Sequence, residues 1–344
     1  MTADPTTDSD GLLRLVRGYQ FTQALHVAVR LGIPDLVADG PQSATDLAAR
    51  CGAHAPALAR LLRALTTLGV FAEVAPEVFG PTPRSHLLRE GVPGSQRAML
   101  MLVGSQLYAG WGHLLHAIRT GETTARRVYG MDSWEWLAQH PEMNAIFNDA
   151  MVEGSAVRVA ALLAVYDFAP FGTVVDVGGG RGALLAGILR AYPGVRGVLC
   201  DRPHVVAGAE TVFAAAGVAE RARIAPGDFF AAVPAGGDAY ILSWILHDWD
   251  DAQVAAILTC CRRAMAGRGV LLLVERVLPD GADRPWEPFF SDLNMLQALD
   301  GRERTEAEWR ALLAGAGFTL TRIVPTTSGF GVIEAHPAST VAIG

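Results

Sequence analysis

The chain contains 344 residues, 51% of them hydrophobic and 18% charged, so it is long and apolar enough to form two folded domains. Its formal net charge of −7 provides no overall basic character for binding nucleic acid or an anionic membrane. All 28 basic residues are arginines, because the sequence contains no lysine. This absence excludes pyridoxal-phosphate enzymes, Schiff-base aldolases and Walker A nucleotidases, each of which needs a lysine amine.

The cysteines and the N-terminus bear on metal binding and compartment. The four cysteines lack a CxxC spacing and have no histidine near them in a zinc pattern, so we expect no metal site. The first ten residues have neither the basic nor the apolar region of a signal peptide. No stretch reaches about 18 uninterrupted apolar residues. We therefore expect a soluble, cytoplasmic protein with reduced thiols.

Residues 11–102 have the apolar spacing of a small helical domain. Apolar residues recur with a helical period from Tyr19 to Leu31, and the following Gly-Ile-Pro ends that helix. Two further helices are expected over 46–52 and 54–69, and the segment FAEVAPEVFGPTP after them alternates like a short hairpin. Helix, helix and β wing in this order predict a winged-helix-like domain.

Such a domain either binds DNA or serves another purpose with the same shape. Its second helix carries only Arg60 and Arg63 among leucines, which offers few contacts to phosphates. We therefore favour a dimerisation domain, with surplus apolar helix surface pairing two copies of the chain into a homodimer. A ligand-sensing regulator remains the alternative.

Residues 103–168 are expected to form a helical linker rich in aromatic residues. Phe147 and Met151 lie in this segment. Aromatic residues and methionines near a domain junction suit an apolar ligand pocket, although they also suit a core. We assign the segment to a substrate-pocket region.

Residues 169–338 alternate short apolar runs with helical segments. The strand candidates are TVVDV, GVLCD, RARIA, DAYILS and GVLLLVE. This alternation predicts an α/β domain whose parallel, Rossmann-like sheet has helices on both faces. Two last runs, TLTRIVP and GFGVIEA, are joined by a short turn, so the final strand can be antiparallel.

A glycine-rich segment, DVGGGRG, follows the first strand and opens a helix. Gly178 and Gly180 allow a tight turn and a close approach of a ligand to backbone N–H groups. Asp201 ends the next strand, where a carboxylate can bind ribose hydroxyls. The pattern also satisfies the dinucleotide fingerprint, so a nicotinamide dehydrogenase is a second possibility.

Later motifs distinguish these possibilities. Asp228 and Phe229, in PGDFF, place an acid and an aromatic ring where they can meet adenine. The segment SWILHDWDD ends a further strand, at the edge where open α/β sheets bind ligands. The nicotinamide dehydrogenase hypothesis accounts for neither PGDFF nor SWILHDWDD.

Together, DVGGGRG, LCDRP, GDFF, SWILHDWDD and GRERT resemble the small-molecule O-methyltransferases that use S-adenosylmethionine. The resemblance covers roughly residues 15–335 and includes plant phenolic and bacterial polyketide enzymes. It implies a class I methyltransferase fold with an N-terminal dimerisation domain. Plant members often carry lysine at the position of Ser243, which favours the bacterial branch.

The resemblance also implies roles for individual residues. His247 matches the general base, flanked and oriented by Glu275 and Glu303. The cofactor-binding positions are Gly178, Gly180, Asp201, Asp228, Phe229, Ser243 and Trp249. The acceptor-pocket candidates are Phe147, Met151, Trp244, Asn294 and Met295.

The expected chemistry suits these residue types. A phenol with a pKa of about 10 is a poor nucleophile at neutral pH, and imidazole with a pKa of about 6.5 is a suitable base. A carboxylate on the other ring nitrogen fixes the tautomer. Some relatives use the same fold for C- or N-methylation, decarboxylation or hydroxylation, so resemblance alone does not certify the reaction.

Overall fold

The computed structural model describes residues 5–281 and 284–338, which contacts between their backbones group into two units. The first unit holds the chain up to Ala109 together with Leu137–Glu153. The second holds Gly110–Trp136 and the chain from Gly154 onward. Three helices cross from one unit to the other: α8 (Tyr108–Trp111), α11 (Ser133–Gln139) and α12 (Pro141–Val165).

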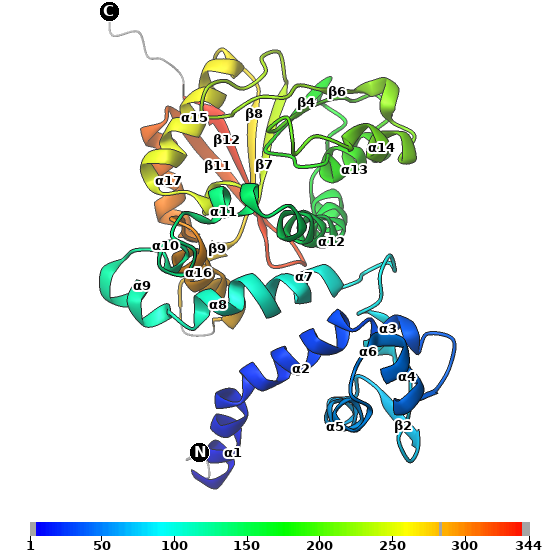
Figure 1. Cartoon of the computed structure of the whole chain (residues 1–344). Helices are drawn as coiled ribbons and strands as arrows, with labels where there is room; N and C mark the ends of the chain where they lie inside the picture. Colours follow the sequence, from blue (N-terminus) through cyan, green and yellow to red (C-terminus); the bar gives the residue numbers. More distant parts are fainter. Residues whose placement is uncertain (1–4, 282–283, 339–344) are drawn as a thin grey trace, which may run out of the picture. The chain divides into compact units, whose positions relative to one another are not determined.

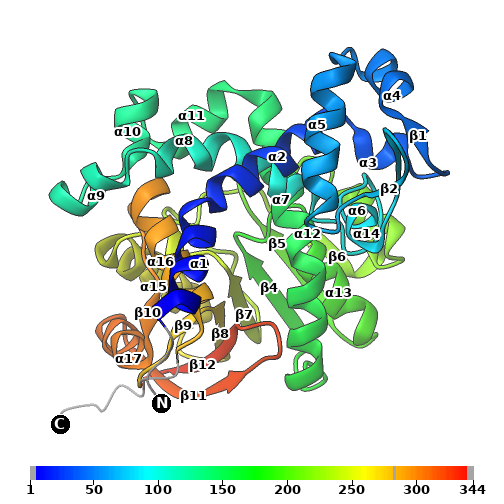
Figure 2. The ribbon, with the colours of Figure 1, turned by 90° about the horizontal axis from the view of Figure 1, so that it is seen from below.

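The first unit is helical apart from one small sheet (Figure 2). Its elements are α1 (Pro5–Val16), α2 (Gly18–Arg30), α3 (Ile33–Leu36), β1 (Gln42–Ser43), α4 (Ala44–Cys51), α5 (Ala55–Thr66), β2 (Ala72–Ala75), β3 (Val78–Gly80), α6 (Pro83–His86), α7 (Arg97–Leu102) and the π-helix η1 (Val103–Leu107). Strands β2 and β3 form the predicted hairpin, and β1 pairs with β3 to give the antiparallel order β1-β3-β2. The winged-helix-like outline is therefore confirmed.

Helices α4 and α5 bury their apolar faces against α2 in one core. Leu47, Leu58, Leu62 and Leu65 are buried there, each at a helical spacing. On the outer face of α5, Arg63 lies within 4 Å of the carboxylates of two glutamates in the hairpin. The charge of this arginine is therefore already balanced within the unit.

The second unit contains a seven-stranded sheet of order β11-β12-β8-β7-β4-β5-β6 (Figure 1). Its strands are β4 (Thr173–Val177), β5 (Arg196–Cys200), β6 (Ala222–Ile224), β7 (Ala239–Ser243), β8 (Val270–Glu275), β11 (Phe318–Pro325) and β12 (Gly331–Pro337). Only β12 runs antiparallel to its neighbours, as the short turn before it predicts. A parallel pair, β9 (Val277–Leu278) and β10 (Arg304–Thr305), lies outside this sheet.

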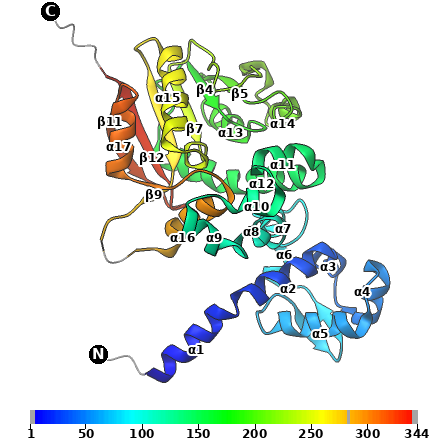
Figure 3. The ribbon, with the colours of Figure 1, turned by 60° about the vertical axis from the view of Figure 1, so that its left-hand side comes forward.

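Helices cover both faces of the sheet because successive strand residues point to opposite sides. Val174 packs into a core with α13 (Ala183–Ala191) and α14 (Ala209–Ala215), whereas Val175 packs into a second core with α15 (Asp251–Met265) and α17 (Glu306–Gly315). Figure 3 shows these helices around the strands of the sheet. The helices of this unit are α9 (Leu114–Thr120), α10 (Thr124–Tyr129), α13 (Ala183–Ala191), α14 (Ala209–Ala215), η2 (Ala219–Arg221), η3 (Leu246–Asp248), α15 (Asp251–Met265), α16 (Trp286–Ala298) and α17 (Glu306–Gly315). The predicted doubly covered α/β sheet is therefore confirmed.

Parallel strands place their carboxyl ends at one edge of the sheet. The loops after β4, β5, β7 and β8 therefore meet at this edge, and they carry the glycine loop, Asp201, the HDW segment and Glu275. Within the described residues, no helix is long and apolar enough to cross a membrane.

Candidate active site

The glycine loop after β4 is shaped by its lack of side chains. Gly178 and Gly180 have φ angles of 72° and 61°, a region that favours glycine. The backbone N–H of Gly180 donates a 2.8 Å hydrogen bond to Asp201 at the end of β5. The loop is therefore anchored to the predicted ribose-binding acid, while its neighbouring N–H groups stand at the start of α13.

Asp176, inside β4, is a buried acid that the sequence analysis assigned no role. Neither of its carboxylate oxygens has a hydrogen-bond partner among the described residues. Burial, with Asp201 adding repulsion, raises the pKa of Asp176 to about 7. A β-carbon on Gly179 would come within 2.4 Å of this carboxylate. An unpaired acid thus lies directly behind the glycine loop.

The structure groups the predicted adenine-binding residues at the same edge. Asp228 accepts a hydrogen bond from the backbone of Phe230, which fixes the loop after β6. The ring centroids of Phe229 and Phe230 lie 6.1 and 4.8 Å from that of Trp249, in edge-to-face geometry. Trp249 also stacks on Trp134 at 6.1 Å. These rings form an aromatic surface on one side of the carboxyl edge of the sheet.

The turn after β7 leaves the sheet sharply. Ser243 is the last strand residue, and Trp244 follows with a φ of 60°, an unusual value for a bulky side chain. The fully buried Glu275 accepts hydrogen bonds of 3.1 and 2.9 Å from the backbone N–H groups of Ile245 and Leu246. Glu275 therefore holds the backbone that carries His247, rather than bonding to the imidazole itself.

Two carboxylates contact the imidazole of His247, which is only 3% exposed. Its Nδ1 lies 2.9 Å from Glu303 Oε1, as the predicted orienting role requires. Its Nε2 lies 3.3 Å from Asp248 Oδ1. Ser291 also donates a 2.7 Å hydrogen bond to Glu303 Oε1, which fixes the carboxylate that faces the ring.

Burial and mutual charge shift the pKa values of this cluster. Burial raises the pKa of Asp248 to about 6 and that of Glu275 to about 7. Burial alone lowers the pKa of His247, but the carboxylates of Asp248, Glu303 and Glu275 outweigh it and raise this pKa to about 9. The free protein therefore keeps His247 protonated at neutral pH. Ligand atoms of His247, Glu275 and Glu303 lie within 4.8 Å of one another, close enough to hold a metal ion.

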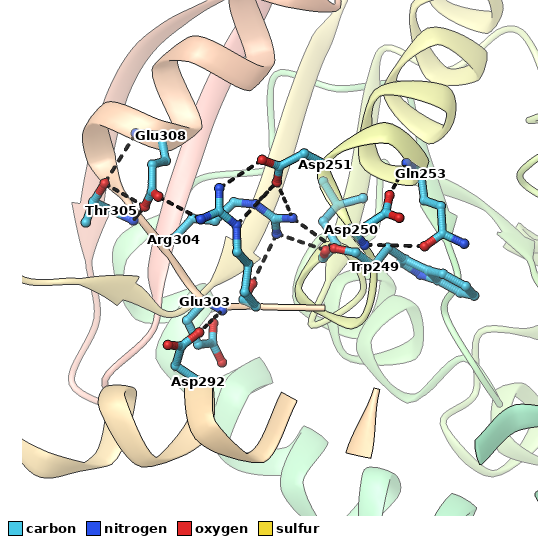
Figure 4. Close-up of polar contacts among 11 residues, drawn as sticks. Trp249, Asp250, Asp251, Gln253, Asp292, Glu303, Arg304, Thr305 and Glu308 are labelled. Atoms are coloured by element: carbon cyan, nitrogen blue, oxygen red, sulfur yellow. Dashed lines mark hydrogen bonds and ion pairs between the residues drawn. The ribbon is translucent and has the colours of Figure 1, made fainter. Parts of the chain in front are cut away.

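A buried arginine from GRERT clamps the loop that contains His247 (Figure 4). The Arg304 side chain is fully buried and donates to the carbonyl oxygens of Leu246 and Trp249, at 3.1 and 2.8 Å. It also donates to Asp251 at 2.8 Å, in the first turn of α15. Gly301 packs against the same loop, since a β-carbon there would come within 1.9 Å of the carbonyl oxygen of His247.

Helix α16 carries the predicted pocket residues Asn294 and Met295. The Asn294 side-chain oxygen accepts hydrogen bonds from Trp111 and Gln297, at 3.3 and 3.0 Å. Met295 is buried. The preceding turns of α16 place Ser291 and Asp292 against Glu303, so the same helix supports the His247 cluster.

Phe147 and Met151 belong to the part of α12 that is in the first unit. There they pack with Ala98, Leu102 and Ala150 in a small apolar cluster. Trp244, by contrast, stacks on His247 with ring centroids 5.2 Å apart. The grouping of Phe147 and Met151 with the other acceptor-pocket residues stays a prediction.

Three residues of the site had no individual role in the sequence analysis: Asp176, Asp248 and Arg304. The sequence alone could have pointed to two of them. Asp176 is an acid within an otherwise apolar strand, and Asp248 directly follows the candidate base. Arg304 stands inside the GRERT motif, but its burial depends on partners about fifty residues away. No local pattern reveals that.

Comparisons with known proteins match both units. A family model described as an O-methyltransferase domain matches residues 111–319, and one described as an O-methyltransferase dimerisation domain matches residues 13–91. The phenazine O-methyltransferase PhzM of Lysobacter antibioticus is 47% identical over 329 residues, which cover 95% of each chain.

Two further relatives extend the range of acceptors. The 8-amino-8-demethylriboflavin N,N-dimethyltransferase of Streptomyces davaonensis is 37% identical, over 92% of this chain and 94% of its own. The crystal structure of NcsB1, an O-methyltransferase from neocarzinostatin biosynthesis, matches with a TM-score of 0.81 and 34% identity, over 92% of this chain and 96% of that one. It contains S-adenosylmethionine and 2-hydroxy-5-methyl naphthoic acid.

The clamp by Arg304 predicts a large stability effect. Arg304→Met keeps the apolar stem but leaves the carbonyl oxygens of Leu246, Trp249 and Arg302 without this donor, so the free energy of unfolding should fall by about 2–4 kcal/mol. Arg310→Met is the control, because Arg310 forms an exposed pair with Glu306 one turn away and donates to only one carbonyl oxygen, that of Leu320; its loss should cost about 1 kcal/mol. Urea unfolding measures both, and equal losses would contradict the clamp.

The raised pKa of His247 predicts how stability depends on pH. Because the folded pKa of about 9 exceeds the ordinary 6.5, the imidazolium–carboxylate interaction stabilises fully below about pH 6.5 and is lost as pH rises through 9. The unfolding temperature should therefore fall between pH 7 and 9.5 in the wild type and less in His247→Gln. His54→Gln, at an exposed histidine, is the control. A histidine NMR titration with a midpoint at or below 6.5 for His247 would refute this.

Proposed function

Because this chain belongs to the O-methyltransferase family and is a methyltransferase that depends on S-adenosylmethionine, we propose that it methylates a hydroxyl of an aromatic, phenolic or polyketide-like small molecule. The observation that carries this proposal is the buried His247, paired through Nδ1 with Glu303 at the carboxyl edge of the sheet. A histidine held in this way can use Nε2 for chemistry once a ligand shares or replaces the contact of Nε2 with Asp248.

The residues at the edge fit S-adenosylmethionine. The unpaired, buried Asp176 can pair with an ammonium group, and Gly178 and Gly180 leave room for a ligand against the backbone. Asp201 would hold ribose hydroxyls. On the adenine side stand Asp228, Phe229 and Trp249, and Ser243 would contact the cofactor between them. When bound, the cofactor supplies a methyl group on a positively charged sulfur, which needs an aligned nucleophile more than further activation.

His247 would accept the proton of the acceptor hydroxyl at Nε2. The N–H at Nδ1 would donate to Glu303, which fixes the tautomer and stabilises the imidazolium that forms. Glu275 would keep the ring in place through its two hydrogen bonds to the preceding backbone. His247 would thus accept the proton, while Glu303 and Glu275 would orient and support the imidazole.

Asp248 adds a condition to this mechanism. Because its carboxylate lies 3.3 Å from Nε2, an acceptor hydroxyl must share or replace that contact to reach the base. His247 must also be neutral before it accepts a proton, although its pKa is about 9 in the free protein. A cation bound beside the ring lowers this pKa. With the cofactor in place, His247 would therefore be neutral at working pH and able to accept a proton.

A second candidate is methylation of an aromatic nitrogen. The relative from Streptomyces davaonensis is named for N,N-dimethylation, at 37% identity. An amine acceptor that is neutral at working pH has a free lone pair and needs no base before attack. Dependence of the rate on His247 therefore separates the two candidates.

We also propose that the chain is a homodimer formed through its N-terminal unit. Helix α1 exposes Leu12, Leu13, Leu15 and Val16, which are between 49% and 79% accessible. These apolar side chains are exposed on one helix, and the dimerisation model matches the chain from residue 13. Contact between the α1 helices of two copies of the chain would bury these apolar side chains.

Replacing the base tests the mechanism. His247→Ala should lower turnover with labelled S-adenosylmethionine and a panel of aromatic hydroxyl acceptors by about 10²–10⁴-fold at neutral pH. Glu303→Gln should give a smaller loss. Because neither residue is expected to touch adenosine, calorimetry should show almost unchanged affinity for S-adenosylhomocysteine, and much weaker binding of NAD.

The controls separate chemistry from folding. His336→Ala, at a half-exposed histidine paired with Glu334, should keep full turnover. Treatment with a chelator should leave the rate unchanged, since the proposed role of His247 needs no metal. Near wild-type turnover in His247→Ala would mean that the enzyme acts by alignment alone or on an amine, and the proposed role would be wrong.

The dimer proposal has its own test. Light scattering at micromolar concentration should give twice the chain mass of 36.5 kDa, and Leu12→Glu with Leu15→Glu should shift it to the monomer. Charges on the exposed Val74, also in the first unit, serve as the control. A wild-type species of 36.5 kDa would contradict the proposal.

A further inference from the structure

Three buried side chains of the site bring atoms that can bind a metal ion close together. His247 lies in the turn after β7, Glu275 at the end of β8 and Glu303 directly before β10, and each is at most 3% exposed. One ligand atom of each residue lies within 4.8 Å of those of the other two. The expectation of no metal site rests on the cysteines, and this group contains none. Its members are distant in the sequence, so only the fold brings them together.

Each of the two glutamates has one carboxylate oxygen in use and one without a partner. Oε1 of Glu275 accepts two backbone hydrogen bonds, and Oε1 of Glu303 faces Nδ1 of His247 and accepts a hydrogen bond from Ser291. Oε2 of both glutamates is buried without a hydrogen-bond partner among the described residues. Leaving two buried carboxylate oxygens unpartnered costs free energy, which a cation bound between them relieves.

The types of donor atom indicate which cation fits. One imidazole nitrogen and two carboxylate oxygens are ligands that Zn²⁺ accepts, at about 2.0–2.2 Å, and a water molecule can complete four-coordination. The ligand atoms of such an ion lie about 3.4 Å apart, so movements of less than about 1 Å by each side chain would close the group around it. Two carboxylates and a neutral imidazole also balance the charge of a divalent cation. Mg²⁺ fits poorly, because it prefers oxygen ligands in octahedral geometry.

A metal ion in this group would prevent His247 from acting as a base. The ring nitrogen that faces Glu303 is Nδ1, whereas Nε2 faces Asp248, which is not one of the three residues. An imidazole that binds a metal ion through Nδ1 carries its remaining proton on Nε2. Nε2 is then a hydrogen-bond donor and cannot accept the proton of an acceptor hydroxyl.

We propose that His247, Glu275 and Glu303 form a binding site for a divalent transition-metal ion, with Zn²⁺ as the best fit, and that occupation of this site inhibits methyl transfer. The ion takes the place of the proton between Nδ1 and Glu303 and leaves again without any change in covalent bonds. The inhibition rests on the proposed role of His247 as the base, whereas the binding of the ion does not. Methyl transfer itself needs no metal, so the site is inhibitory and reversible.

A cluster that serves only to hold the imidazole makes a different prediction. In that case zinc binds only at accessible histidines such as His116 and His336, each of which lies beside a glutamate. Glu275→Gln and Glu303→Gln distinguish the two cases. Glutamine keeps one oxygen to accept the existing hydrogen bonds, but it replaces the second oxygen with an amide nitrogen, which is not a zinc ligand.

The first experiment measures zinc binding by the full chain, in competition with a chromophoric zinc chelator and without cofactor or acceptor. We expect one zinc ion per chain in the wild type, and at least tenfold weaker binding in Glu275→Gln and in Glu303→Gln. His116→Ala, His336→Ala and Cys51→Ser are the controls, because they remove accessible ligands outside the group, and each should change the affinity by less than about twofold. Unfolding temperatures check that every variant folds.

Two further measurements identify the bound ion's surroundings and its effect. Co²⁺ in place of Zn²⁺ should give the strong visible absorption of a four-coordinate ion, and both glutamine variants should lose this absorption. Loading the wild type with Zn²⁺ should lower turnover at least tenfold, a chelator should restore it, and Mg²⁺ should have no effect.

Zinc binding that is equally tight in the wild type and both glutamine variants would mean an adventitious ion only and would overturn the proposal. Full or increased turnover of the zinc-loaded wild type would overturn the inhibitory role. If His247→Ala also keeps full turnover, the proposed function fails instead, while weaker zinc binding in both glutamine variants still supports the metal site.

Discussion

The guanidinium of Arg304 joins two segments that are 53 residues apart in the sequence, and the position of His247 depends on it. The turn that carries His247 is a single 3-10 turn between β7 and α15, so it has few backbone hydrogen bonds of its own. Arg304 satisfies carbonyl oxygens on both sides of the histidine, while Glu275 satisfies the N–H groups before it. Hydrogen bonds from Arg304 and Glu275 therefore fix the conformation of the loop that contains His247.

This arrangement also explains how so many charges tolerate burial together. Glu303 and Asp248 contact the two ring nitrogens of His247, and Ser291 donates a further hydrogen bond to Glu303. Burial raises the pKa of Asp248 and Glu275, whereas the imidazole stays charged because the neighbouring carboxylates outweigh the effect of burial on it. The imidazole is therefore protonated in the free protein and would become neutral, and able to accept a proton, when another cation binds beside it. Such coupling would link proton acceptance to cofactor binding.

Much of the fold follows from local patterns. Alternating apolar runs and helices predict the sheet, and the glycine loop, Asp201 and the HDW segment fall at one edge because parallel strands align their ends. The family resemblance carried by GRERT implies that Glu303 orients His247, and the structure places Glu303 2.9 Å from Nδ1. Contacts between distant segments are different, because the hydrogen bonds of Arg304 to the loop that contains His247 depend on tertiary packing. Domain boundaries and the pocket roles of Phe147 and Met151 stay predictions.

The central claim is that the clamped loop presents Nε2 of His247 to the acceptor hydroxyl. A crystal structure of the ternary complex with S-adenosylhomocysteine and a hydroxylated aromatic acceptor tests this most directly. The account predicts the acceptor oxygen within about 3.2 Å of Nε2, with the Asp248 contact lengthened or shared and the Glu303 contact kept. An acceptor oxygen bound to another group, with Nε2 still paired only to Asp248, would contradict it.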